Sequence, residues 1–210
     1  MEDALRAVFP YAELEIYTYM LGASRALWGH KQGIACILGT GANAGYYDGE
    51  NVFTHPSLGF LLGDEASGAS LGKAFLKMYL RGRLPLPLAE TFEQETGLTY
   101  ALIMENLYMK PFPARFMASL ASFVIGHKGV PEIDALINTE LNAFFEHMVI
   151  PLSREFNCRQ ISFTGSIATA LEQEIKIKSY EFDLQVHRCI TSPIQLLADY
   201  HLGKKLDSSP

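Results

Sequence analysis

The chain has few cysteines, and those present are far apart. Cys36, Cys158 and Cys189 are the three among 210 residues, and no C-x-x-C pair occurs. A disulfide framework needs paired cysteines and a zinc knuckle needs closely spaced ones, so the sequence favours neither. We expect reduced thiols in apolar surroundings and no metal site.

Basic residues are also scarce. The chain carries 17 Lys and Arg against 23 Asp and Glu, which gives a formal net charge of −6. A protein that binds along a nucleic-acid groove clusters its cations to neutralise phosphates. The sequence therefore predicts no nucleic-acid partner.

Long hydrophobic runs and a secretion signal are absent as well. The longest apolar runs, such as 116–125, are too short to cross a bilayer. The first residues include Glu2 and Asp3, where a secretion signal carries basic side chains. We expect a cytoplasmic protein with no membrane partner.

What the chain does have is the balance of a globular domain, with 49% hydrophobic and 19% charged residues. Alternating residues and short apolar runs predict strands at 14–18, 34–38, 44–47, 52–54, 160–164 and 181–186. Apolar residues at helical spacing predict helices at 3–8, 20–28, 88–95, 100–108, 112–127, 131–156, 168–175 and 192–201, and another after Ala66. Pro151 is expected to kink or interrupt the longest helix. The order is strands, a helical insert, and then strand, glycine and helix.

A glycine-rich loop follows the predicted buried strand 34–38. Gly39, Thr40 and Gly41 lead directly to Ala42 and Asn43. Glycines let a phosphate approach the backbone closely, and Thr40 adds a hydroxyl donor. The loop is not a P-loop, because G-x-x-x-x-G-K-[ST] does not occur. An ordinary turn after a strand is the other interpretation.

Two further segments combine small residues with a helix start. Asp64 and Glu65 lie in the segment 59–68, where a carboxylate either caps the helix or holds a sugar hydroxyl. Strand 160–164 runs into Gly165 and Ser166 at the start of another helix. A glycine there can lie against an adenine ring or face a phosphate, although such turns are also common in other proteins.

The order of these motifs resembles a known family. A G-T-G-x-N loop, then G-x-x-x-G-D-E-x-S-G, a helical insert and a strand–Gly–Ser–helix unit are similar to those of the BadF/BadG/BcrA/BcrD-type ATPases. The likeness extends to segments 21–27, 57–60, 110–116 and 191–193 and covers nearly the whole chain. The chain looks most like the bacterial N-acetylglucosamine kinase-like proteins of this family, within the actin-like ATPase and hexokinase (ASKHA) superfamily.

The resemblance implies an α/β fold with a ribonuclease-H-like C-terminal lobe. Residues 1–30 would be the end of an N-terminal lobe and a connecting helix, and residues 31–210 the C-terminal lobe, with a helical insert at about 66–157. It also implies a kinase that transfers the γ-phosphoryl group of ATP, with magnesium, to the 6-hydroxyl of an amino sugar such as N-acetylglucosamine.

The same resemblance assigns roles to individual residues. Gly39, Thr40 and Gly41 match the family's second phosphate loop. Gly165 and Ser166 match its adenosine-side motif. Asn43 and Asp64 match the positions that hold the sugar.

Two departures from the family bear on activity. The family's first phosphate loop, D-G-G-x-T, does not occur in this sequence, and Tyr19 stands where the family has its general-base aspartate. A phenol is a far weaker proton acceptor than a carboxylate near neutral pH. Smaller departures are Ala42 and Ala66, where the family usually has serine and glycine. We therefore predict that the isolated chain is inactive and has no catalytic residue of its own.

An alternative function stays open. The chain is then a non-catalytic, truncated paralogue that acts as a sugar-binding or protein-interaction module. A lobe without its partner exposes an apolar cleft wall, so we also predict a homodimer.

Overall fold

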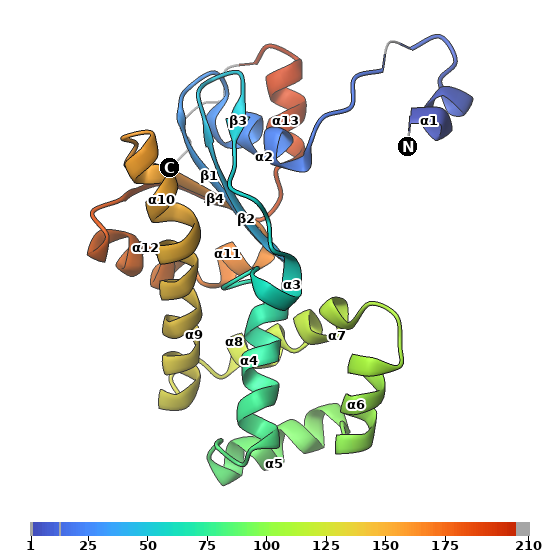
Figure 1. Cartoon of the computed structure of the whole chain (residues 1–210), viewed down its shortest axis with the longest axis vertical. Coiled ribbons are helices and arrows are strands. Elements are labelled where there is room, and N and C mark those ends of the chain that lie inside the picture. Colours follow the sequence, from blue (N-terminus) through green and yellow to red (C-terminus); the bar gives the residue numbers. More distant parts are fainter. Residues whose placement is uncertain (1, 13, 205–210) are drawn as a thin grey trace.

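The computed structural model describes residues 2–12 and 14–204. A mixed five-stranded sheet lies in the upper part of Figure 1, in the order β3-β2-β1-β4-β5. Its strands are β1 (Gly33–Leu38), β2 (Ala42–Tyr47), β3 (Val52–Phe53), β4 (Gln160–Thr164) and β5 (Gln185–Ile190). β1 pairs antiparallel with β2 and parallel with β4, and β4 pairs parallel with β5. The loops that follow these three parallel strands therefore lie at one edge of the sheet, which is where open α/β sheets bind ligands.

Most of the chain outside the sheet is helical. The helices are α1 (Glu2–Val8), α2 (Tyr19–Trp28), α3 (Gly59–Leu62), α4 (Gly68–Leu80), α5 (Leu86–Thr96), α6 (Tyr100–Tyr108), α7 (Pro113–Ser119), α8 (Ala121–Gly126), α9 (Pro131–Phe144), α10 (Ile150–Glu155), α11 (Ser166–Ala170), α12 (Glu172–Glu181) and α13 (Ile194–His201). Helices α3 to α10 come between β3 and β4, so the predicted order of strands, helical insert and strand–glycine–helix is confirmed. In Figure 1, α4 runs away from the sheet, α5 and α6 lie toward the far end, α7 and α8 come back alongside α4, and α9 returns toward the sheet.

Side chains of β1 point alternately into two cores, so both faces of the sheet are covered at this strand. Ile34, Cys36 and Leu38 point into the larger core, which includes buried residues of α4, α9 and α12. Ala35 points the other way, into a smaller core with Trp28 and other residues of α2. Helix α13 packs against α2 on this second face. The near-continuous burial of β1 follows from this two-sided cover.

Pro151 interrupts the long helix without a sharp break. Helix α9 passes through the π-helical turn η1 (Phe145–Val149) into α10, with Pro151 in the first turn of α10. Proline has no N–H to donate to the carbonyl four residues earlier, and its ring crowds that carbonyl. The wider π-turn accommodates both effects, so the expected interruption is confirmed.

Four predicted elements are wrong in type or extent. The predicted helix 168–175 is two helices, α11 and α12, which meet at Leu171. Residues 14–18 are extended, but they pair with no strand among the described residues. The predicted helix 112–127 is two helices, α7 and α8, which meet at Leu120. The strand predicted at 181–186 starts only at Gln185, because α12 continues to Glu181 and Asp183 turns with a positive φ of 55°. In each case the difference depends on pairing or packing with distant segments.

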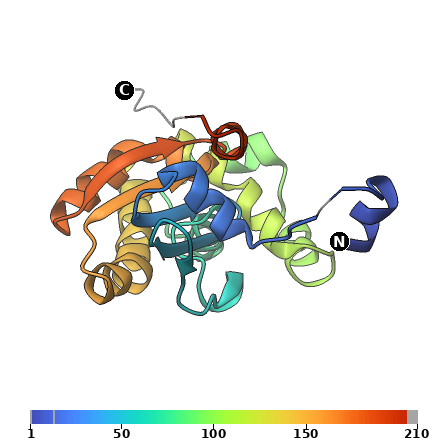
Figure 2. The ribbon, with the colours of Figure 1, turned by 90° about the horizontal axis from the view of Figure 1, so that it is seen from above.

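The remaining features concern the first helix and the cysteines. Helix α1 stands away from the rest of the molecule (Figures 1 and 2). Among the described helices, none is long and apolar enough to cross a membrane. The three cysteines are free thiols, as expected, and burial raises the pKa of Cys36 far above its usual value. A thiol that resists ionisation in this way is a poor nucleophile.

Candidate functional site

A cavity of about 450 Å³ lies beside the end of β1. Three segments supply its walls: the start of α2, the loop between β1 and β2, and the loop before α4. The lining residues are Thr18, Tyr19, Met20, Ile37, Gly39, Thr40, Gly41, Ala42, Asn43 and Asp64. The structure thus brings together the residues predicted for sugar binding, those predicted for the phosphate loop, and Tyr19.

The loop Gly39–Gly41 is held from behind by α4. It connects two antiparallel strands through three residues, and the Gly39 N–H donates to the Gly41 carbonyl at 2.9 Å. The first two N–H groups of α4, from Gly68 and Ala69, donate to the carbonyls of Gly39 and Thr40 at 2.8 and 3.1 Å. A Cβ at Gly39 would meet no heavy atom within 4 Å. The helix therefore fixes the loop from one side, and the backbone at Gly39 faces open space on the other.

Asp64 contacts this loop through its carboxylate. Its backbone has a positive φ of 57°, and a Cβ at Gly41 would lie 2.9 Å from the Asp64 Oδ2 atom. Glycine at position 41 is therefore what allows the carboxylate to approach the loop. Burial raises the pKa of Asp64, and the negative charge of Glu65 adds to this effect. The Ala42 backbone N–H and the positive charge of Lys73 partly oppose it.

Asn43 presents hydrogen-bond donors to the cavity. Its Oδ1 accepts the N–H of Ala44 at 2.9 Å, which orients the side chain. Its Nδ2 group has no hydrogen-bond partner within residues 2–12 and 14–204, and the residue belongs to the cavity lining. Asp64 and Asn43 thus offer an acceptor and a donor in the same space.

Tyr19 occupies the first turn of α2. Thr18 caps this helix, its Oγ1 accepting the Leu21 N–H at 3.2 Å. The Tyr19 side chain is 66% exposed, and no acidic residue lies in the first turn of the helix. The position predicted for the general base is therefore at the cavity and open to solvent, but it carries a phenol.

Gly165 and Ser166 lie at the same sheet edge but outside the cavity lining. Gly165 follows β4 with a φ of +121°, and a Cβ there would lie 2.1 Å from the Leu38 carbonyl oxygen at the end of β1. Its N–H donates to the Ile190 carbonyl at 3.0 Å. Ser166 is exposed at the start of α11. The two residues that were predicted to border adenosine therefore lie beside the end of β1, next to the glycine loop, and outside the cavity lining.

Sequence reasoning missed two features of this site. Glu65, the second carboxylate of the pair, does not line the cavity, and its Oε1 lies 3.2 Å from Nδ1 of His147. Glu140 of α9 accepts hydrogen bonds from the Ala66 N–H at 3.4 Å and from the Ser70 hydroxyl. No local pattern could have found either contact, because both join segments more than sixty-five residues apart.

The described residues include no group of three or more His, Cys, Asp or Glu side chains that could hold a metal ion. The titratable groups of the cavity itself are Asp64 and Tyr19. The lining of this cavity offers hydrogen-bonding groups, which include one carboxylate, one amide and a glycine-rich backbone loop.

Comparisons with known proteins place this arrangement in a family. No model of a protein family matches the chain, and no curated protein matches it either. The crystal structure of a candidate N-acetylglucosamine kinase from Porphyromonas gingivalis is 37% identical, with a TM-score of 0.91, over 96% of this chain and 71% of that protein.

Two more distant structures share the fold. A candidate N-acetylglucosamine kinase from Chromobacterium violaceum is 23% identical, with a TM-score of 0.70, over 93% of this chain and 70% of that one. A ROK family glucokinase from Streptomyces griseus, in complex with glucose and AMPPNP, is 15% identical, with a TM-score of 0.54, over 95% and 70%. The predicted fold class, that of the actin-like ATPases and sugar kinases, is thereby confirmed. On the identity and coverage of the Porphyromonas gingivalis protein, the chain belongs to its family of sugar kinases.

Proposed function

We propose that this chain supplies the sugar-binding wall, and part of the nucleotide-binding wall, of an ATP-dependent N-acetylglucosamine kinase. The observation that carries the proposal is the convergence of Asp64, Asn43 and the loop Gly39–Gly41 on one cavity. Carboxylate and amide side chains are the groups that hold sugar hydroxyls in fixed positions, and a glycine loop suits a phosphate. The similarity to the candidate N-acetylglucosamine kinase from Porphyromonas gingivalis supports the same substrate.

Each side chain has a role in this proposal. The Asp64 carboxylate accepts a hydrogen bond from a sugar hydroxyl, and the Asn43 amide donates one. The N–H groups of Thr40 and Gly41 and the Thr40 hydroxyl face the phosphates in this proposal, while Gly165 and Ser166 border the adenosine. ATP, when bound, supplies the γ-phosphoryl group for transfer to the 6-hydroxyl. Magnesium receives no protein ligand from this chain in the proposal.

We propose that turnover by this chain alone is slow or absent. Tyr19 stands at the cavity where a carboxylate would accept the proton of the attacking hydroxyl, and loss of a general base typically costs about a hundred- to ten-thousandfold in rate. The second candidate function, a non-catalytic module that binds sugar, rests on the same residue. Sugar binding without Mg-ATP binding favours this second function, and binding of both favours the kinase.

The first test is calorimetric titration of the chain with N-acetylglucosamine and, separately, with Mg-ATP. We expect sugar binding that weakens about tenfold in Asn43→Ala, because a hydrogen bond to the sugar is lost. Asn138→Ala is the matched control, since Asn138 is exposed on α9 and is not part of the cavity lining. Absence of sugar binding by the wild-type chain, or equal affinity in the Asn43 variant, contradicts the proposal.

We propose three finer assignments as well. They are membership of the BadF/BadG group, the cytoplasmic location, and the division into residues 1–30 and 31–210 with an insert at about 66–157. These ranges include residues 1, 13 and 205–210, which lie outside the described residues.

We also propose that the chain forms a homodimer. Exposed apolar side chains on α3 and near α7, including Leu61, Leu62 and Phe112, give it a surface for self-association. Analytical ultracentrifugation is expected to show a dimer at micromolar concentration. A single monomeric species at that concentration contradicts this prediction.

A further inference from the structure

The loop that presents Asp64 has an unfavourable backbone. Asp64 and Ala66 have positive φ values of 57° and 58°, a region that residues with a Cβ rarely adopt. Ala66 is also completely buried. Such a conformation persists only where surrounding contacts stabilise it. Residues with such backbone conformations are often found together at functional sites.

Glu140 of α9 provides one of these contacts. Its Oε2 atom accepts the Ala66 N–H at 3.4 Å and also the Ser70 hydroxyl. Ser70 lies in the first turn of α4, so a single carboxylate oxygen joins the loop to the helix that follows it. The Ser67 hydroxyl caps the same turn by accepting the Ser70 N–H at 3.1 Å.

The same turn of α4 holds the glycine loop. The N–H groups of Gly68 and Ala69 donate to the Gly39 and Thr40 carbonyls, as described above. Glu140 is therefore connected to both sides of the cavity, to Asp64 through Ala66 and to the glycine loop through the start of α4. It does not itself line the cavity.

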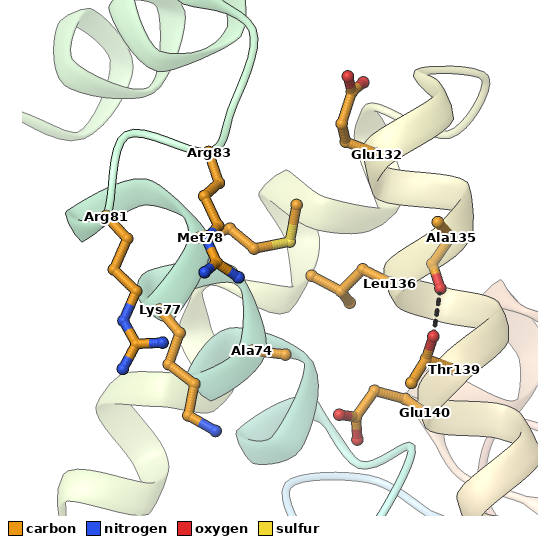
Figure 3. A pocket seen from close by; sticks show the side chains of 10 residues that line it. All are labelled: Ala74, Lys77, Met78, Arg81, Arg83, Glu132, Ala135, Leu136, Thr139 and Glu140. Atoms are coloured by element: carbon orange, nitrogen blue, oxygen red, sulfur yellow. Dashed lines mark hydrogen bonds between the residues drawn. The ribbon is translucent and has the colours of Figure 1, made fainter.

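The other side of Glu140 is open to a second pocket. Figure 3 shows this pocket between α4 and α9, with Glu140 near one end and Glu132 near the other. Its volume is about 420 Å³. Glu132, on the same helix, lines the same pocket but makes no hydrogen bond to the 64–70 segment. Small solutes can therefore approach the Glu140 carboxylate from behind the site.

We infer that Glu140 is a positioning residue, which keeps the 64–67 loop in the conformation that turns Asp64 toward the cavity. This inference rests on the proposed function in so far as Asp64 binds sugar. A carboxylate suits this task because hydrogen bonds to a charged acceptor are stronger than neutral ones. A neutral side chain of similar shape preserves the packing but weakens the hold on the loop.

The test compares Glu140→Ala and Glu140→Gln with Glu132→Ala. In Glu140→Ala we expect the amides of the 64–70 segment to exchange hydrogen for deuterium at least about tenfold faster, and N-acetylglucosamine to bind at least about tenfold more weakly. Glu140→Gln keeps one acceptor oxygen and is expected to fall between this variant and the wild type. Glu132→Ala, which loses a carboxylate from the same pocket, is expected to behave as the wild type does.

Added formate distinguishes positioning from general stability. In Glu140→Ala, formate can enter through the pocket between α4 and α9 and replace the missing carboxylate, so we expect it to restore slow exchange and sugar affinity. Chloride is expected to restore neither. If exchange in the 64–70 segment is unchanged in both Glu140 variants, or if formate has no effect on Glu140→Ala, the inference is overturned. If the wild-type chain binds no sugar, the proposed function fails, while exchange still decides whether Glu140 holds the loop.

Discussion

Replacing Gly72 with alanine is expected to destabilise the protein by about 3 kcal/mol or more, since overpacking against a rigid neighbour exceeds what side-chain shifts relieve. Gly72 lies in α4 where this helix crosses α7. A Cβ at this position would lie 1.9 Å from the carbonyl oxygen of Met117 and 2.6 Å from its carbon. Both are backbone atoms, so the two helices must separate to admit one methyl group.

Separation of α4 from α7 affects more than local packing. One turn earlier, a Cβ at Gly68 would lie 3.2 Å from the Cβ of Ala118, so the two helices stay close over this length. The N-terminus of α4 also holds the Gly39–Gly41 loop. Because the total stability of a domain is about 5–15 kcal/mol, a loss of this size is a large fraction of it.

Urea denaturation followed by circular dichroism measures this effect. Gly126→Ala is the matched control: Gly126 ends α8, and a Cβ there would meet no heavy atom within 4 Å. Alanine is the better helix former, so the control is expected to be neutral or slightly stabilising. A Gly72→Ala protein with the wild-type denaturation midpoint would falsify the close crossing of α4 and α7.

Replacing Asp64 with asparagine is expected to weaken N-acetylglucosamine binding by about ten- to a hundredfold, because a hydrogen bond to a charged acceptor is lost. The fold is expected to be at least as stable as before. Asparagine has the same shape as aspartate and tolerates a positive φ, which is 57° at this residue. The substitution therefore separates function from stability, as is typical of sites that trade stability for binding.

The difference in stability between the wild type and Asp64→Asn should depend on pH in a defined direction. Burial raises the pKa of Asp64 above its value in the unfolded chain, so the folded protein binds this proton more readily. The ionised carboxylate then lowers the free energy of unfolding at neutral pH, and this penalty disappears as the pH falls through the folded pKa. We expect Asp64→Asn to be more stable than the wild type near neutral pH, with the difference shrinking in acid.

Thermal unfolding across this pH range, with calorimetry for the sugar, tests both parts. Asp183→Asn is the matched control, because Asp183 also has a positive φ but lies outside the cavity, in an exposed ion pair with Arg159. Its sugar affinity is expected to equal that of the wild type, and loss of an exposed pair costs about 0–1 kcal/mol. Unchanged sugar affinity in Asp64→Asn would rule out Asp64 as a sugar ligand.

The elements that local patterns specify were predicted well. Strand 160–164 and helix 100–108 have the predicted bounds, and α2 ends at residue 28 as predicted, where Gly29 caps it with a positive φ of 62°. Strand β1 is predictable because apolar residues between glycines fit a strand covered on both faces. These signals depend on neighbouring residues, which interact in the same way wherever the rest of the chain lies.

Features that depend on a distant partner were not predictable in the same way. Residues 14–18 alternate as a strand does, but a strand also needs a neighbour with which to share hydrogen bonds, and the described residues supply none. The start of β5 at Gln185 is set by its register with β4, in which Gln160 is opposite Gln185. The same alternating pattern fits several registers, and only the sheet selects one.

The same distinction between neighbouring residues and distant partners applies to the candidate site. The sequence by itself determined which segments carry glycine, amide and carboxylate groups, and that Tyr19 stands near the start of a helix, because these are properties of short stretches of chain. Only the tertiary structure decided that Asp64 faces the cavity while Glu65 turns to His147, and that Glu140 holds the loop between them and α4. Two adjacent carboxylates are equivalent in a sequence pattern, and only tertiary contacts distinguish them: Asp64 lies against Gly41, and Glu65 lies against His147, 82 positions along the chain.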